Sequence, residues 1–146
     1  MNLYAESSAV LAWLLGEPGA APVRDFLGEA GLVLASDLTL IECRRALVRA
    51  SAAGALPEAT AERRRAHLRG ALEHWILFRL EEEIVERASR PFPREPIRTL
   101  DAIHLATALL AQSLVPDLAL LSLDDRVREN GARMGFRLLP EIVPGL

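Results

Sequence analysis

Short apolar segments alternate with helix-forming segments along this chain, and this alternation restricts the fold more than any other feature of the sequence. The apolar segments have the length of strands, and they lie at residues 2–5, 32–35, 76–80, 118–122 and 136–139. Strands that are almost continuously apolar are buried on both faces, as in a parallel sheet covered by crossover helices. The sequence therefore predicts an α/β fold with a parallel sheet of about five strands, flanked by helices on both faces.

The segments between these strands carry helical signals, which are apolar residues at helical spacing and capping residues at the start. They predict helices over residues 9–15, 21–29, 37–53, 59–73, 82–90, 99–112 and 124–134. Ser7 and Ser8 are N-cap candidates for the first helix. Residues 90–96 are rich in proline and are predicted to form a loop. No repeat or low-complexity segment interrupts the pattern, so all 146 residues are expected to form one domain.

The segment at 99–109 is predicted to be the central helix, because apolar side chains cover most of its circumference and such a helix is buried. Asp101 lies in its first turn, at the edge of the core. An unpaired buried carboxylate costs several kcal/mol, so Asp101 requires a cap, a partner or a metal ion. The plain structural explanation is that Thr99 is the N-cap and that Asp101 interacts with the positive end of the helix dipole.

Three more acids lie where a predicted strand gives way to a helix. Glu6 follows the first strand, Glu42 lies near the start of the helix after the second, and Asp124 follows the fourth. Ligands of parallel sheets bind outside the carboxyl ends of the strands. The four acids are therefore expected to reach one edge of the sheet.

Each of these acids also has a structural explanation. Glu42 has the capping-box spacing from Thr39, Asp124 suits the helix dipole, and Glu6 can simply be solvated. Converging carboxylates, however, repel one another and destabilise a fold that gains nothing from them. A hard divalent cation removes that penalty, and oxygen ligands without Cys or His favour Mg²⁺ or Mn²⁺ over zinc. Such an ion can activate a water and polarise a phosphoryl group for in-line attack.

Composition excludes several classes of protein. Apolar residues make up 51% of the chain, which indicates a globular domain. The net charge of −3 gives no overall basic field for nucleic acid, so an RNA would be held by a metal ion or by the arginine clusters at 44–49 and 63–69. Cys43 is the only cysteine, which excludes an internal disulfide and suits a reducing cytoplasm. Neither a signal peptide nor a membrane span is expected, because the apolar run at 9–15 is too short.

With these residues in place, the chain resembles the PIN-domain family, and within it the VapC-type toxin ribonucleases of type II toxin–antitoxin pairs. The matching stretches cover essentially the whole chain in the family's order, and they lie at residues 4–10, 40–42, 100–108, 121–127 and 135–136. The most specific is the run Asp-Ala-Ile-His-Leu-Ala that begins at Asp101. The family usually has Asp where this chain has Glu6, and the longer acid is expected to alter the metal affinity and the rate.

The resemblance implies a metal-dependent endoribonuclease that hydrolyses RNA phosphodiester bonds at a four-acid site. By position, the catalytic acids are Glu6, Glu42, Asp101 and Asp124, and all of them except Glu42 hold Mg²⁺ or Mn²⁺. Ser8 and Ser122 match polar positions that orient the acids or a water. The resemblance also implies a homodimer and a cognate antitoxin that blocks the site.

Two other functions stay open. A PIN-like module that has lost catalysis would bind a protein or RNA partner without cleaving it, and Glu6 would be the mark of that loss. A phospho-accepting receiver domain is also an α/β domain with clustered acids, but that family requires a lysine and this chain has none. His104 is interpreted as a buried structural histidine rather than a catalytic base.

Overall fold

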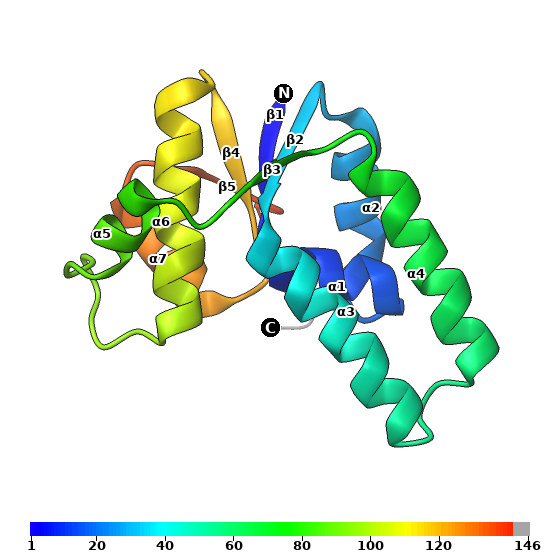
Figure 1. The fold of residues 1–146 in the computed structure, drawn as a ribbon. Coiled ribbons are helices and arrows are strands. Elements are labelled where there is room, and N and C mark those ends of the chain that lie inside the picture. The colour runs from blue at the N-terminus through cyan, green and yellow to red at the C-terminus, as the bar shows by residue number, and fades with distance from the viewer. Residues whose placement is uncertain (142–146) are drawn as a thin grey trace.

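The computed structural model describes residues 1–141 and shows the predicted parallel sheet (Figure 1). Its strands lie in the order β3-β2-β1-β4-β5, and every neighbouring pair is parallel. The strands are β1 (Asn2–Ala5), β2 (Leu32–Ser36), β3 (Ile76–Phe78), β4 (Leu118–Leu121) and β5 (Arg137–Leu139). The predicted α/β fold is therefore confirmed.

Helices cover both faces of the sheet, as Figure 1 shows. One layer consists of α1 (Ser7–Leu15), α2 (Ala20–Glu29), α3 (Asp37–Ala52) and α4 (Glu58–Leu72). The other consists of α5 (Glu82–Ala88), α6 (Thr99–Leu114) and α7 (Asp125–Arg133). Every predicted element is present, and its bounds differ from the prediction by at most two residues.

The side chains of β1 alternate between the two layers. Tyr4 packs into the core that α5, α6 and α7 form, whereas Leu3 and Ala5 pack into the cores on the side of α1 to α4. Because both faces of the strand are covered, neither face has a place for solvated polar side chains. This explains why β1 is apolar from Leu3 to Ala5.

The order of the sheet places the ends of β1 and β4 next to each other. Strand order reverses between these two strands, because β2 and β3 lie on one side of β1 while β4 and β5 lie on the other. Ala5 is in register with Leu121, and the backbone N–H of Glu6 donates to the Leu121 carbonyl at 3.0 Å. The crevice outside the carboxyl ends of such strands is the usual ligand site of an open α/β sheet. Glu6 follows β1 directly, and Asp124 follows β4 after Ser122 and Leu123.

Two helix starts differ from the prediction. Glu6, rather than Ser7 or Ser8, is the N-cap of α1, because Glu6 is the last residue with an extended backbone and its side chain accepts from the N–H of Ser8. Arg98, rather than Thr99, is the N-cap of α6, with φ −76° and ψ 156° and no capping hydrogen bond from its side chain. Both corrections put a charged residue at a helix start.

No helix within residues 1–141 is long and apolar enough to cross a membrane.

Candidate active site

The four predicted acids line one cavity of about 250 Å³. It lies beyond the carboxyl ends of β1 and β4, between α1, α3 and the start of α6. Glu6 and Asp101 are buried, each with 4% exposure, whereas the side chains of Glu42 and Asp124 are 26% exposed. The structure thus brings together acids from four separate stretches of the chain.

Two serines fix the carboxylate of Glu6. The hydroxyl of Ser122 donates to Glu6 Oε2 at 2.8 Å, and the Ser8 hydroxyl donates to the same oxygen. The backbone N–H of Ser8 donates to Glu6 Oε1 at 3.2 Å. Ser122 also accepts from the N–H of Asp124 at 3.2 Å, so one hydroxyl connects two acids. Both serines therefore have the contacts expected of residues that orient an acid.

Glu42 is partly exposed and contacts the buried side chains of His104 and Ser7. Its Oε1 lies 2.6 Å from His104 Nε2 and accepts from the Ser7 hydroxyl at 3.0 Å. The capping box with Thr39, the structural alternative for Glu42, is not formed, because Ser36 caps α3 by accepting from the Thr39 N–H at 3.3 Å. Glu42 lies more than one turn into the helix, where its side chain points across to α1 and α6 instead of back to the helix start.

His104 and Glu42 each stabilise the charged form of the other. Burial lowers the pKa of His104, but the hydrogen bond to Glu42 and the charges of Glu6, Glu42 and Asp101 outweigh it, so the pKa lies above its ordinary value of 6.5. Burial raises the pKa of Glu42, and the hydrogen bond and charge of His104, with Ser7 and Arg98, more than reverse that effect. His104 is 2% exposed, as expected for a buried histidine, but its Nδ1 has no hydrogen-bond partner within residues 1–141.

Arg98 bridges the remaining two acids. Its Nε donates to Asp101 Oδ2 at 3.0 Å and its Nη2 to Asp101 Oδ1 at 3.2 Å, while Nη2 also donates to Asp124 Oδ2 at 3.2 Å. The other oxygen of Asp124 caps α7 by accepting from the N–H groups of Arg126 and Val127. Asp124 therefore has both its expected structural role at the helix start and a place in the cavity.

Arg98 and Ser7 are the two residues of this site that the sequence did not indicate. An arginine three residues before an acid has the spacing of an intrahelical ion pair, which was the available signal for Arg98. Ser7 stood out only as a capping residue, and its hydroxyl instead contacts Glu42 and His104. In the arginine cluster of α4, Arg65 forms surface ion pairs with Glu58 and Glu62 at 3.0 Å. Arg64 instead donates to the Leu14 carbonyl at 2.7 Å.

The donors of this cavity suit a hard divalent cation in chemistry but not in their present arrangement. Carboxylate and hydroxyl oxygens are the ligands that Mg²⁺ and Mn²⁺ prefer. Within residues 1–141, however, no group of three or more His, Cys, Asp or Glu side chains is arranged so that it could hold a metal ion. Each acid instead faces a protein partner, and Arg98 lies between the two aspartates. The donor set therefore matches such an ion in chemistry, while Asp101 and Asp124 are paired with Arg98 in this structure.

Solved toxin structures share this fold. VapC20 of Mycobacterium tuberculosis, described as a sarcin–ricin loop cleaving toxin, superposes with a TM-score of 0.65 at 17% identity, over 97% of this chain and 99% of that one. VapBC2 of Rickettsia felis, bound to a promoter DNA fragment, has a TM-score of 0.61 at 10% identity, over 94% of this chain and 97% of that one. A toxin–antitoxin complex from Klebsiella pneumoniae gives 0.61 at 18% identity, over 92% and 93%.

Sequence comparison agrees with the fold. The model of the PIN domain family matches residues 3–132. Ribonuclease VapC46 of Mycobacterium tuberculosis is 34% identical over 138 residues, which cover 94% of this chain and 95% of the relative. Ribonuclease VapC35 of the same organism is 28% identical and covers 98% of this chain and 97% of the relative. The chain therefore belongs to the PIN-domain family and groups there with proteins of the VapC type.

Proposed function

We propose that this chain is an endoribonuclease, the toxin of a VapBC-type toxin–antitoxin pair, and that it hydrolyses RNA phosphodiester bonds with Mg²⁺ or Mn²⁺ bound at the four acids. The observation that carries the proposal is the convergence of Glu6, Glu42, Asp101 and Asp124 on one cavity at the switch point of the sheet. The two relatives named as ribonucleases align over nearly their whole length, which supports the same reaction here.

Asp101 would be a direct metal ligand, and Glu6 and Asp124 would bind directly or through water. When bound, the ion supplies Lewis acidity, an activated water and charge neutralisation at the phosphate. Without a cation, the four carboxylates would repel a phosphodiester. Glu42 is held by His104 and Ser7 at the edge of the cavity, and its proposed role is to position a water.

The chain's own residues pre-organise this cavity. The backbone N–H of Ser8 donates to Glu6 Oε1, and the hydroxyls of Ser8 and Ser122 donate to Glu6 Oε2, so both oxygens of the carboxylate are held. Because hydrogen bonds to a charged group contribute about 1.5–3 kcal/mol, the two serines restrict where Glu6 can place an oxygen. This arrangement supports Glu6 as a ligand and argues against loss of catalysis at this position.

We propose a cognate antitoxin as the protein partner, which two of the structurally similar complexes support. A homodimer is proposed from the family alone. A reducing cytoplasm as the site of action accords with Cys43, a buried free thiol.

The test compares the wild type with Asp101→Asn and with a matched control, Asp125→Asn. Asp125 is an exposed acid in the first turn of α7 and does not line the cavity. We expect Mn²⁺ binding by calorimetry and Mn²⁺-dependent cleavage of labelled RNA to be lost in Asp101→Asn and kept in Asp125→Asn, with both variants folded. Unchanged metal affinity in Asp101→Asn would refute the site. Absent cleavage by a wild type that still binds an antitoxin would favour the non-catalytic module.

A further inference from the structure

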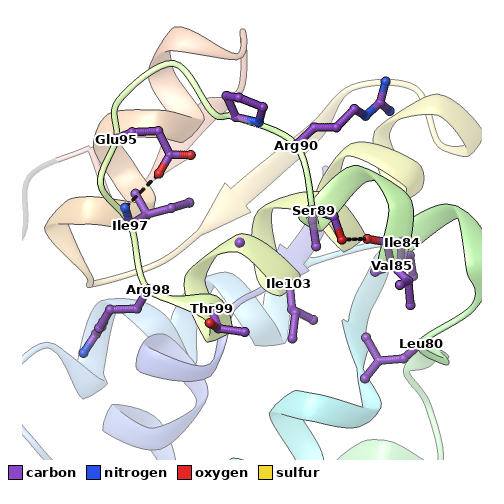
Figure 2. A pocket seen from close by; sticks show the side chains of 13 residues that line it. Leu80, Ile84, Val85, Ser89, Arg90, Glu95, Ile97, Arg98, Thr99 and Ile103 are labelled. Atoms are coloured by element: carbon purple, nitrogen blue, oxygen red, sulfur yellow. Dashed lines mark hydrogen bonds between the residues drawn. The ribbon is translucent and has the colours of Figure 1, made fainter.

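Arg98 is the one cation that contacts the aspartates of the cavity, among the residues that the structure describes. Its guanidinium makes three hydrogen bonds, two to Asp101 and one to Asp124. It comes from the loop between α5 and α6, and Figure 2 shows its side chain pointing away from Leu80 and Ile103, which line the neighbouring apolar cavity. Arg98 thus reaches out of one cavity and into the other.

The two carboxylates need this cation. Asp101 is buried, and a second carboxylate within reach of the same nitrogen would repel it. A guanidinium neutralises both because its planar fork matches carboxylate oxygens. Arg98 donates to both oxygens of Asp101 and to Oδ2 of Asp124, which are oxygens that a divalent ion would also bind. The guanidinium and the ion therefore compete for the same carboxylates.

The Arg98 side chain is exposed enough to move away from the two aspartates. Its side chain is 61% exposed, in contrast to the 6% exposure of the Asp101 side chain. Its backbone role in α6, where its carbonyl accepts from the Ala102 N–H at 3.0 Å, does not depend on the position of the guanidinium. The long stem can therefore swing outward without disturbing the helix start.

We infer that Arg98 is an exchangeable cation of this site: it holds Asp101 and Asp124 together without metal, is displaced when a divalent ion binds, and then binds an RNA phosphate beside the cavity. Arginine suits both partners, because the same fork pairs with carboxylate and with phosphate. The inference rests on the proposed metal-dependent cleavage of RNA, and it adds a residue outside the four acids.

The first experiment measures Mn²⁺ binding by calorimetry without RNA, in the wild type, Arg98→Gln and Arg94→Gln. Arg94 is the matched control, since it lies in the same loop, is 62% exposed and pairs with Glu129 rather than with a cavity acid. We expect Arg98→Gln to bind Mn²⁺ about tenfold more tightly than the wild type, as removal of a partly exposed bidentate pair would allow. Arg94→Gln should stay within about twofold, the scale of screened surface charges.

The outcomes separate this inference from the proposed function. The metal site would stand and the role of Arg98 would be overturned by either of two results. The first is equal Mn²⁺ affinity of the wild type and Arg98→Gln, and the second is an equal increase of Mn²⁺ affinity in Arg98→Gln and Arg94→Gln. Weaker binding by Arg98→Gln would also overturn it. If neither the wild type nor Arg98→Gln binds Mn²⁺, both proposals are contradicted. If Arg98→Gln binds Mn²⁺ and the wild type does not, the result supports the exchange of Arg98 for the ion. Arg98→Lys keeps the charge but lacks the planar fork of the guanidinium. Its Mn²⁺ affinity should therefore fall between those of the wild type and Arg98→Gln.

The second experiment tests the phosphate interaction with a 2′-O-methyl RNA oligonucleotide at saturating Mn²⁺, and gel electrophoresis of the recovered oligonucleotide verifies that it stays intact. Removing one phosphate interaction should reduce the magnitude of the slope of log K against log salt by about 0.7 for a single strand. We expect this decrease in Arg98→Gln and the wild-type slope in Arg94→Gln. A wild-type slope in Arg98→Gln, or an equal decrease in both variants, would refute the phosphate interaction.

Discussion

Replacing His104 by Gln removes the imidazolium from the pair with Glu42 but keeps a side chain of similar length that can donate to the carboxylate. The pair has a distance of 2.6 Å, with His104 2% and the Glu42 side chain 26% exposed. Hydrogen bonds to charged groups contribute about 1.5–3 kcal/mol, and the partial exposure of Glu42 favours the lower part of that range. We therefore expect His104→Gln to lose about 1–2 kcal/mol of unfolding free energy at pH 6.

The pH dependence of this loss follows from the two pKa shifts. The pKa of His104 is raised above 6.5, so its contribution is complete below pH 6.5 and is lost as the pH rises through the raised value. The pKa of Glu42 is lowered below 4.5, so its contribution is complete above pH 4.5 and is lost as the pH falls through the lowered value. The difference between wild type and variant should therefore be largest between pH 4.5 and 6.5.

Thermal and urea unfolding in EDTA, at pH 5.5 and at pH 9, measure this difference. For a chain of this length, 1–2 kcal/mol corresponds to a Tm shift of about 2–8 °C. His74→Gln is the control, because His74 is an exposed histidine on the surface. A difference that stays constant from pH 5.5 to pH 9 would show that His104 is not charged in the folded protein, and the reasoning would be wrong.

Three further predictions concern packing, reactivity and the unusual acid. Gly131→Ala should lower the free energy of unfolding by about 1–3 kcal/mol, because an added Cβ would lie 2.5 Å from Leu120 Cδ2. Gly70→Ala, which has open space at its Cβ, should raise it by about 0.5–1 kcal/mol, and urea unfolding measures both changes. Burial, with the charges of Glu42 and Glu6, raises the pKa of Cys43 to about 12, so a thiol reagent at pH 8 should label the folded protein far more slowly than the unfolded chain. Glu6→Asp should retain or raise Mn²⁺-dependent RNA cleavage, and unchanged activity together with unchanged Mn²⁺ affinity would place Glu6 outside the site.

The fold could be predicted because its determinants are local in the sequence. A strand such as β4 is apolar at every position, since Leu118 and Leu120 face one core and Ala119 and Leu121 face the other. This pattern distinguishes a doubly covered parallel sheet from a half-exposed antiparallel one. The rule that ligands bind beyond the carboxyl ends of the strands then selected the acids at the strand–helix junctions.

The partners of those acids could not be predicted in the same way. Side-chain direction across elements decides them, and local spacing misled at Glu42, whose capping-box spacing from Thr39 has no counterpart in the structure. Glu42 contacts residues 35 positions before it and 62 positions after it. Contacts of that range depend on how α1, α3 and α6 pack against each other, which no short pattern records.

The four acids differ in the partners that hold their carboxylates, and this difference indicates which of them can change partner. Glu6 is fixed by the hydroxyls of Ser8 and Ser122, and Glu42 by His104. Ser122 and His104 are buried, and Ser8 is half-buried. Asp101 and Asp124 share Arg98, whose side chain is mostly in solvent. Exchanging a buried partner would expose an unpaired polar group to the core, which costs about 1–3 kcal/mol, whereas Arg98 returns to water when it leaves. A divalent ion should therefore enter at Asp101 and Asp124 and meet a Glu6 carboxylate that the two serines already hold in place.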